Sequence, residues 1–579
     1  MTDTLKKVIA YARPYIAYFG FSVIFALLGV GLSLFVPVFI GNAVDCCIGK
    51  GKVDFDELKK IVILLAVMVV ASGIFQWLMS LFTNKLAFLT VRDLRADIFN
   101  KLERVPLKYI DGHTKGELTS RVINDIEIVS DGLLQGFTQF FSSIMTIIGT
   151  LAFMMFINLK IAVVVVIMTP LSFIVASKIT KASHDSYMKQ SKLRGDMVGL
   201  AEEMAGNQKI VNAFSYQERA EERFDRINRE YGKIGTKATF LSSITNPSTR
   251  FVNGMIYACV GLLGSLGVTG KVGFIGKMTV GKLTSFLSFS NQYTKPFNEI
   301  SGVFAELQNA VASAQRVFDV LAEEEVSDDS GKAEISDCTG NLTFDNVCFS
   351  YNPDTELIKN FSLDVKSGSK IAIVGPTGCG KSTIINLLLR FYDIDSGNII
   401  VSGSNINDIT RDSLRSQFGM VLQETWIFTG TVADNISYGV PTASREEIIQ
   451  SAKEVHAHSF IKRLPQGYDT VISDDSGLSQ GQKQLICIAR IMLMNPPMLI
   501  LDEATSSIDL RTEHRIQRAF TKLMDGRTSF IIAHRLSTIK NSDMILVMKN
   551  GNVIEQGNHL QLMKKGGFYS ELYNSQFAT

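Results

Sequence analysis

The chain has 579 residues, and its 58 Lys and Arg against 56 Asp and Glu give a net charge of +2. That length allows several domains at roughly 100–200 residues each, while so even a charge balance argues against a nucleic-acid partner. Mean hydropathy is positive, +0.18, although 20% of the residues are charged. We therefore expect two unlike halves, an apolar one over 15–300 and an α/β one over 335–579.

Six apolar segments in the first half are long enough to cross a bilayer as helices, which takes about 20 residues each. The last two are less apolar and carry Pro247, Asn253, Asn291 and Pro296, so their polar groups should face protein or a wet cavity. The third and fourth are separated only by a tight turn that starts at Asn158. The expected spans lie near 15–40, 60–83, 134–157, 160–179, 243–267 and 275–300.

The connections between these spans alternate in length. Two long, charged, helix-patterned stretches, 84–133 and 180–242, carry most of the Lys and Arg of the first half, and the other connections are short. The positive-inside rule places the long stretches and both termini in the cytoplasm. Residues 1–17 predict a short basic amphipathic helix, with no cleavable signal peptide. A plain membrane anchor for a soluble enzyme needs one span and none of these excursions.

Seven cysteines show no CxxC pair and no metal-ligand spacing. They predict small buried residues in a reducing compartment. The adjacent Cys46 and Cys47 fall in a predicted loop, where a reactive site stays open as an alternative.

The second half contains a phosphate-binding pattern. An apolar strand at 371–374 runs into residues 375–382, GPTGCGKS, which match GxxxxGK[ST] and open a helix. Backbone N–H groups freed by the glycines, together with the helix dipole, would hold phosphate oxygens. Lys381 would contact the β- and γ-phosphates, and Ser382 would bind magnesium. Cys379 lies inside the loop, so thiol reagents are expected to block nucleotide binding there.

Two further apolar strands end in chemically useful residues. The strand MLILDE ends in Asp502, expected to hold magnesium, and Glu503, expected to polarise the attacking water as general base. The strand TSFIIAH ends in His534, which we place at the carboxyl edge of the same sheet, where ligands bind in such folds.

With these elements in place, the chain resembles an ATP-binding-cassette (ABC) exporter half-transporter over essentially its whole length. The resemblance rests on LSQGQ, which runs from Leu478 through Ser479, Gln480 and Gly481 to Gln482, and on the order of the other motifs. It assigns Tyr351 to the adenine-stacking position, Gln423 to magnesium and coupling, and Asp509 to the D-loop. It also assigns the turns 107–113 and 212–219 to coupling helices.

The resemblance completes the set of expected ATP-binding and catalytic residues. The catalytic residues are Glu503, His534 and Gln423, and the magnesium residues are Ser382, Gln423 and Asp502. The ATP-binding residues are Tyr351, Gly375, Pro376, Thr377, Gly378, Cys379, Gly380, Lys381, Ser382 and Thr383.

Gln480 stands where this family's commoner signature, LSGGQ, has glycine. Ser479 and Gln482 also form a capping box, S-x-x-Q, which makes Gln480 the first helical residue with ordinary negative φ. A silent substitution is one interpretation. The family offers another, because heterodimeric exporters pair a chain that keeps the catalytic glutamate but has a deviant signature with a chain that lacks the glutamate. This chain keeps Glu503 and so resembles the first kind.

These observations predict an all-α six-helix transmembrane domain with long cytoplasmic extensions, followed by an α/β P-loop ABC ATPase domain. The expected bounds are 1–325 for the membrane domain, 326–340 for a linker and 341–579 for the cassette. The predicted function is ATP-driven export of hydrophobic or amphipathic small molecules across the plasma membrane, with ATP and Mg²⁺, as half of a heterodimer. The alternatives are a homodimeric lipid flippase, a peptide exporter, an importer using the exporter fold, and an ATP-gated channel or regulatory subunit.

Overall fold

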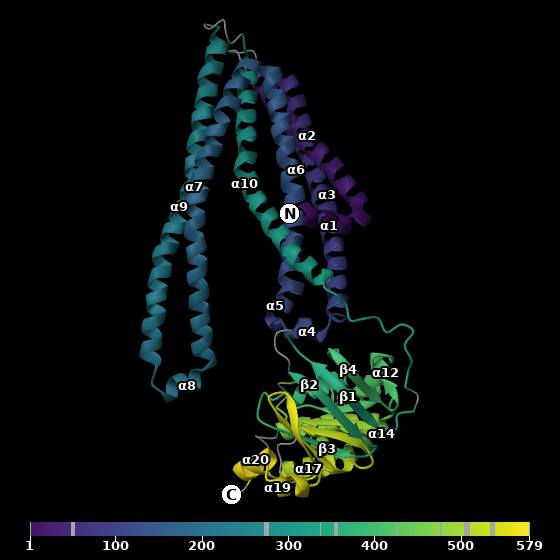
Figure 1. Ribbon diagram of the computed structural model, residues 1–579. Coiled ribbons are helices and arrows are strands. Elements are labelled where there is room, and N and C mark those ends of the chain that lie inside the picture. Colours follow the sequence, from purple (N-terminus) through teal and green to yellow (C-terminus); the bar gives the residue numbers. More distant parts are fainter. Residues whose placement is uncertain are drawn as a thin grey trace. The chain divides into compact units, whose positions relative to one another are not determined.

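The chain divides into two compact units (Figure 1). One unit comprises Met1–Arg104 and His113–Glu323, and the other comprises Val105–Gly112 and Glu324–Thr579. The computed structural model describes residues 2–47, 53–270, 277–335, 337–352, 357–423, 425–474, 477–502, 510–532 and 539–577.

In the first unit, the described residues form helices joined by short turns and contain no strand. Four helical segments there have the length and hydropathy to cross a membrane, Asp3–Cys46, Phe55–Leu102, Lys115–Ile157 and Gln217–Thr269, and Leu159–Leu171 is a shorter apolar stretch. The expected spans fall in α2, α3, α6, α7, α9 and α10, except that Tyr15 lies in η1 and residues 277–279 precede α10. Residues 275 and 276 lie outside the described residues. The helices are α1 (Thr2–Ala12), η1 (Arg13–Tyr15), α2 (Ile16–Cys46), α3 (Phe55–Leu102), α5 (Lys115–Ser120), η2 (Arg121–Asp125), α6 (Ile126–Ile157), α7 (Leu159–Gly206), α8 (Gln208–Ala213), α9 (Gln217–Thr269) and α10 (Val280–Ala322).

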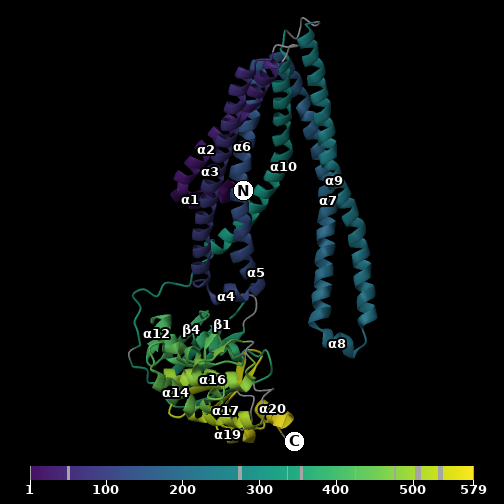
Figure 2. The ribbon, with the colours of Figure 1, turned by 180° about the vertical axis from the view of Figure 1, so that it is seen from behind.

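Two of these helices, α7 and α9, form a long hairpin closed by α8 (Figure 1), and Figure 2 shows the same pair from behind. The turn expected before α7 is a single residue, Asn158, whose side chain accepts hydrogen bonds from the first N–H groups of α7. The short helix expected at 212–219 begins earlier, at Gln208. It ends before that range does because Ser215 adopts a left-handed φ of 49°.

Small residues let α2 and α10 approach closely, as is common between membrane helices. A Cβ added to Gly281 would lie 2.0 Å from the carbonyl oxygen of Gly41. Ser285 donates a 2.8 Å hydrogen bond to the carbonyl of Pro37, and Asp45 accepts one of 2.7 Å from the N–H of Gly281. These contacts fix the register of the two helices.

The cysteines are less buried than the sequence suggested. Within the described residues only Cys379 and Cys487 are buried, and both lie in the second unit. Cys46 is the last residue of helix α2 rather than part of a loop, and the exposed Cys47 follows it.

The described residues of the second unit form two large sheets and a two-stranded one, β7-β8. A six-stranded sheet has the order β12-β11-β3-β10-β9-β6, and a four-stranded antiparallel sheet has the order β2-β1-β4-β5. The strands are β1 (Leu342–Phe349), β2 (Ile358–Val365), β3 (Lys370–Val374), β4 (Ser396–Val401), β5 (Ser404–Asn405), β6 (Phe418–Val421), β7 (Gly430–Thr431), β8 (Val471–Ile472), β9 (Met498–Asp502), β10 (Thr528–Ile532), β11 (Met544–Lys549) and β12 (Asn552–Gly557).

Helices cover the six-stranded sheet, whose parallel strands are buried on both faces and therefore nearly continuous apolar runs. Alternate residues of β9 enter two different cores: Leu499 and Leu501 pack with α16, while Met498 and Ile500 pack with α11 and the four-stranded sheet. The helices of this unit are α4 (Leu107–Asp111), α11 (Lys381–Leu388), α12 (Arg411–Ser416), α13 (Val432–Ile436), η3 (Ser437–Gly439), α14 (Arg445–Glu454), α15 (His458–Ile461), η4 (Gly467–Asp469), α16 (Gln480–Met494), α17 (Leu510–Leu523), α19 (His559–Lys565) and α20 (Phe568–Phe577).

Candidate nucleotide-binding site

The phosphate loop joins β3 to α11 as the sequence predicts. Gly378 and Gly380 have φ of 80° and 99°, a region that side chains rarely adopt, so both positions favour glycine. Gly375 is needed for space, because a Cβ there would lie 2.4 Å from the carbonyl oxygen of Met548. Pro376 and Thr377 are exposed, which leaves the outer side of the loop open.

The ammonium group of Lys381 is hydrogen-bonded to the backbone of the phosphate loop. Its Nζ donates hydrogen bonds of 2.9 and 3.0 Å to the carbonyls of Gly375 and Pro376. Ser382, the next residue of α11, is exposed, and Thr383 is buried. A helix N-terminus, a fixed ammonium group and an open glycine-rich backbone form a set of donors that fits a polyphosphate.

Cys379 lies beneath this loop rather than on its surface. Its side chain is 3% exposed, and its carbonyl accepts a 3.0 Å hydrogen bond from the N–H of Gly551. Only the backbone of Cys379 is therefore available to a ligand. A bulky thiol reagent can reach the Cys379 thiol only when the loop opens, so the predicted block of nucleotide binding should develop slowly.

Parallel strands bring the other expected residues to the carboxyl edge of the same sheet. Asp502, at the end of β9, is paired in register with Ile532 of β10, which in turn pairs with Ile373 of β3. Gln423 is exposed and lies two residues beyond the end of β6, the neighbour of β9. Glu503, Asp509 and His534 lie outside the described residues.

Tyr351 belongs to an aromatic cluster beside α11. Its hydroxyl donates to Thr383 Oγ1 at 3.2 Å, and its ring meets that of Tyr392 edge-on, with centroids 5.0 Å apart. The Tyr392 hydroxyl donates in turn to Asp111 at the end of α4, which is part of the same compact unit. Burial and the neighbouring Asp111 carboxylate raise the pKa of Tyr392, so this hydroxyl remains a donor.

The signature segment has the cap expected from its sequence. Ser479 is the N-cap of α16, and its capping box with Gln482 confirms the predicted S-x-x-Q geometry. Gly481 is buried in the first turn, and Leu478 packs against the core. Gln480 is exposed, and its side-chain amide donates a 3.1 Å hydrogen bond to Thr425 Oγ1.

One face of α16 continues this contact with the segment that follows Gln423. Cys487 Sγ lies 3.8 Å from the carbonyl oxygen of Trp426, and Arg490 Nε donates to the carbonyl of Asn435 at 2.8 Å. Gln480, Cys487 and Arg490 are spaced by seven and three residues, so they share one helix face. The sequence motifs do not include Thr425 or Trp426. The aromatic Trp426 in "TWIF" was the sequence signal that could have drawn attention to this segment.

Comparisons with known proteins agree with this geometry. Family models for the "ABC transporter transmembrane region" and the "ABC transporter" match residues 19–297 and 358–506. The "Fatty acid ABC transporter ATP-binding/permease protein" of Mycobacterium bovis is 41% identical over 90% of this chain and 82% of its own length. The chain belongs to the ABC transporters. It joins a helical transmembrane domain to an ABC ATPase domain in one half-transporter, which confirms the predicted fold class.

Two further relatives fit an ABC exporter. The "Putative multidrug export ATP-binding/permease protein YgaD" of Bacillus subtilis is 32% identical over 99% of both chains. The solved "Structure of a bacterial Atm1-family ABC exporter with ATP bound" matches with a TM-score of 0.77 and 29% identity, covering 98% of this chain and 99% of that chain. The protein is thus a multi-pass membrane ATPase that binds ATP and couples it to transport. Half-transporters of this kind act as dimers.

Proposed function

We propose that this half-transporter exports hydrophobic or amphipathic small molecules across the plasma membrane at the expense of ATP. The observation that carries the proposal is a complete phosphate loop, from β3 to α11, in one chain with helices long and apolar enough to cross a bilayer. The cassette and both termini are placed in the cytoplasm, where ATP is available and where the basic helical extensions are expected.

Hydrolysis is assigned to residues at the carboxyl edge of the sheet. Ser382, Gln423 and Asp502 offer oxygen ligands from α11, from the end of β6 and from β9, which suits Mg²⁺. Glu503 follows Asp502 in the sequence and is the proposed general base. Lys381 would exchange its carbonyl partners for phosphate oxygens.

Replacing the general base tests this assignment. Glu503→Gln keeps the size of the side chain but removes its basicity, so ATP hydrolysis should fall by roughly 100-fold or more while ATP still binds. The measurement is phosphate release by the assembled transporter, with binding of a fluorescent ATP analogue as the control. Hydrolysis near the wild-type rate would exclude Glu503 as the base.

The partner is proposed to be a different chain. Gln480 alters the pocket that this signature offers to the partner's ATP, whereas the chain's own phosphate loop has the complete motif. We therefore assign the hydrolytic site to this chain's phosphate loop together with the partner's signature. This chain's LSQGQ would then close a slower site on the partner.

Expression of the chain alone and with a candidate partner tests the assembly. We expect ATP hydrolysis and transport in membrane vesicles only when a second half-transporter, encoded next to this one, is co-expressed. Size-exclusion chromatography should give a complex with both chains in equal amounts. Full ATPase and transport activity from the single chain would show a homodimer instead.

The cargo class is inferred from the membrane helices and from the relatives. Aromatic side chains pack across helices, with Phe153 stacked on Phe289 at 5.2 Å and edge-on to Phe35 at 5.2 Å. One relative is named a fatty acid transporter and another a multidrug exporter. Stimulation of ATP hydrolysis by fatty acids or lipophilic dyes, but not by peptides, is expected. Stimulation by phospholipid alone would favour a lipid flippase.

A further inference from the structure

The segment between α10 and the cassette is fastened to the cassette. Residues 324–335 contain no helix or regular strand, yet Ala333 pairs with the chain before α12. Its N–H donates to the carbonyl of Asp408 at 3.1 Å, and its carbonyl accepts from the N–H of Thr410 at 3.0 Å. Composition alone predicts a loose linker here, whereas the backbone makes a parallel β-bridge between Ala333 and Ile409.

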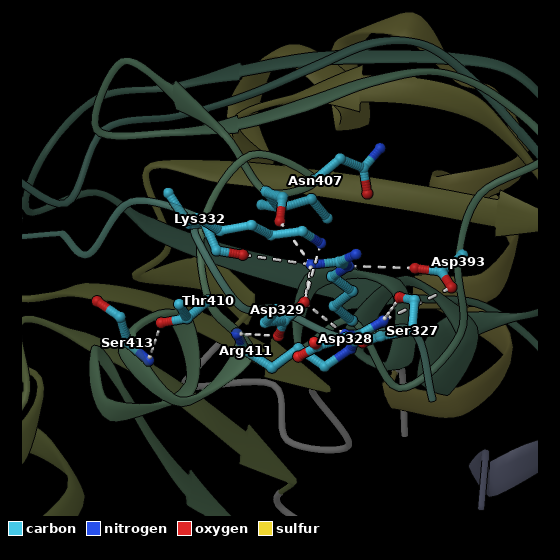
Figure 3. Close-up of polar contacts among 12 residues, drawn as sticks. Ser327, Asp328, Asp329, Lys332, Asp393, Asn407, Thr410, Arg411 and Ser413 are labelled. Atoms are coloured by element: carbon cyan, nitrogen blue, oxygen red, sulfur yellow. Dashed lines mark hydrogen bonds and ion pairs between the residues drawn. The ribbon is translucent and has the colours of Figure 1, made fainter. Parts of the chain in front are cut away.

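The side chain at the centre of this attachment is Asp329, which Figure 3 shows between Lys332 and Arg411. Its carboxylate accepts from Lys332 Nζ at 2.9 Å and from the backbone N–H and the guanidinium of Arg411 at 2.8 and 2.7 Å. Arg390 approaches the same carboxylate at 3.5 Å. Arg411 also donates to the carbonyl and the hydroxyl of Ser327, each at 2.8 Å. We call Ser327, Asp329, Lys332, Arg390 and Arg411 the linker clamp.

The linker clamp is largely buried, and its carboxylate stays charged. The side chains of Arg390, Arg411 and Asp329 are 5%, 9% and 19% exposed. Burial alone would raise the pKa of Asp329, but hydrogen bonds from Lys332 and Arg411 and their positive charges lower it to about 2. Breaking a buried pair leaves its partner charge uncompensated, which is strongly unfavourable. The clamp is therefore a firm attachment at physiological pH.

Arg390 connects the clamp to the nucleotide site. It comes directly after the C-cap of α11, the helix that begins with Lys381, and it has a left-handed φ of 51°. Its guanidinium donates to the carbonyl of Ile406, and its own carbonyl accepts from Arg415. The eight residues of α11 span roughly 12 Å, and their apolar side chains are buried in the core. A movement of the phosphate loop that displaces α11 must therefore displace Arg390.

The linker clamp is also close in sequence to the end of α10. Only residues 323–326 separate the end of α10 at Ala322 from Ser327. Four extended residues span at most roughly 14 Å, so the tether has little slack. We propose that Asp329 is a positioning residue for coupled transport: through Arg390 and Arg411 it ties α10 to the far end of the phosphate-loop helix, so that nucleotide-dependent movement of α11 pulls on α10.

The test uses the full assembled transporter in lipid vesicles, and it rests on the proposed transport function. Asp329→Asn should leave ATP hydrolysis close to wild type, because Asp329 does not touch the nucleotide site. Export of a fluorescent fatty acid per ATP hydrolysed should fall roughly fivefold or more, the lower end of typical coupling between sites. Asp329→Glu should restore most of the coupling. Asp328→Asn is the matched control, since the Asp328 carboxylate accepts from the backbone N–H and the hydroxyl of Ser330, which is not a residue of the linker clamp.

A second readout does not depend on the cargo. Spin labels on p-acetylphenylalanine at the exposed Phe99 and Phe240 report the distance between α3 and α9. The change in this distance on adding ATP and vanadate should be lost in Asp329→Asn and reduced in Arg411→Lys, which keeps the charge but not the fork to Ser327. The proposal would be overturned if both variants kept a distance change of wild-type size. It would also be overturned if ATP hydrolysis were lost together with the distance change. A wild-type chain that moves its helices but no fatty acid would overturn only the cargo assignment.

Discussion

At the scale of single residues, Gln480 illustrates how a departure from a motif can fit its surroundings. Ser479 supplies the N-cap, so position 480 needs no glycine conformation, and the longer side chain reaches Thr425. Thr425 lies two residues beyond Gln423, the residue proposed to contact magnesium. The bond therefore links the segment proposed to face the partner's ATP with the segment proposed to lie at this chain's own ATP.

Removing either end of this bond should have the same consequence. Gln480→Gly and Thr425→Val should each change the stability of the cassette by less than about 1 kcal/mol, because an exposed neutral hydrogen bond contributes little. If the bond couples the two ATP sites, both variants should change the rate of ATP hydrolysis equally, and the double variant should change it no further. The measurement is steady-state phosphate release by the assembled transporter.

The matched control for these variants is Thr521→Val. Thr521 is an exposed threonine on α17 whose hydroxyl donates within its own helix, to the carbonyl of Gln517 at 3.0 Å. It should behave as wild type. Additive effects of Gln480→Gly and Thr425→Val would contradict coupling through their hydrogen bond.

At the scale of elements, the π-helical turn η2 is a structure that no sequence pattern predicted. It joins α5 to α6, and its last residue, Asp125, is buried and accepts from Arg316 of α10 through both carboxylate oxygens. The pair fixes α10 against the start of α6, close to where α10 ends.

Asp125→Asn should therefore destabilise the membrane domain. Loss of a charged hydrogen-bonded pair of this kind costs about 1.5–3 kcal/mol, and Arg316 is half exposed, so the lower end is expected. The check is a lower unfolding temperature of the purified transporter by intrinsic fluorescence. Asp131→Asn, an exposed carboxylate on the same α6, should leave that temperature unchanged, and equal shifts for both would refute the role of the pair.

Also at this scale, the cassette elements follow their sequence patterns because each depends on local chemistry. The phosphate loop needs glycines at fixed offsets, and the capping box at Ser479 needs only its own first turn. The order of strands does not follow from such patterns. Between β3 and β9 the structure inserts β10, whose pairing with both is a matter of packing between distant segments.

At the scale of the whole molecule, the linker clamp gives the attachment of residues 327–332 to the cassette a predictable response to acid. Asp329 has a pKa of about 2 in the folded chain, below the value of about 3.9 for an unperturbed Asp. A depressed pKa means that its contribution to stability is complete above about pH 4 and is lost as the pH falls toward 2. Lys332, Arg390 and Arg411 are the basic groups that face Asp329, and Asp393 accepts from Arg390 at 3.1 Å.

The difference in unfolding temperature between wild type and Asp329→Asn should accordingly be constant from neutral pH to about pH 5 and shrink below pH 4. Differential scanning fluorimetry of both proteins across this range checks it. A difference that grows as the pH falls would mean that another group controls the attachment. Asp328→Asn provides the baseline for removing a carboxylate from the same segment.

The sequence by itself determined the class of the molecule, the phosphate loop and the cap of α16, because each is encoded by hydropathy or by residues a few positions apart. Tertiary structure determined the features that the spacing of residues in the sequence does not predict. It buried Cys379, moved the short helix to Gln208–Ala213, and converted an apparently loose linker into the linker clamp. The physical reason is that Asp329 and Arg411 are 82 residues apart. The charge of each is visible in the sequence, but only folding brings the two together out of water.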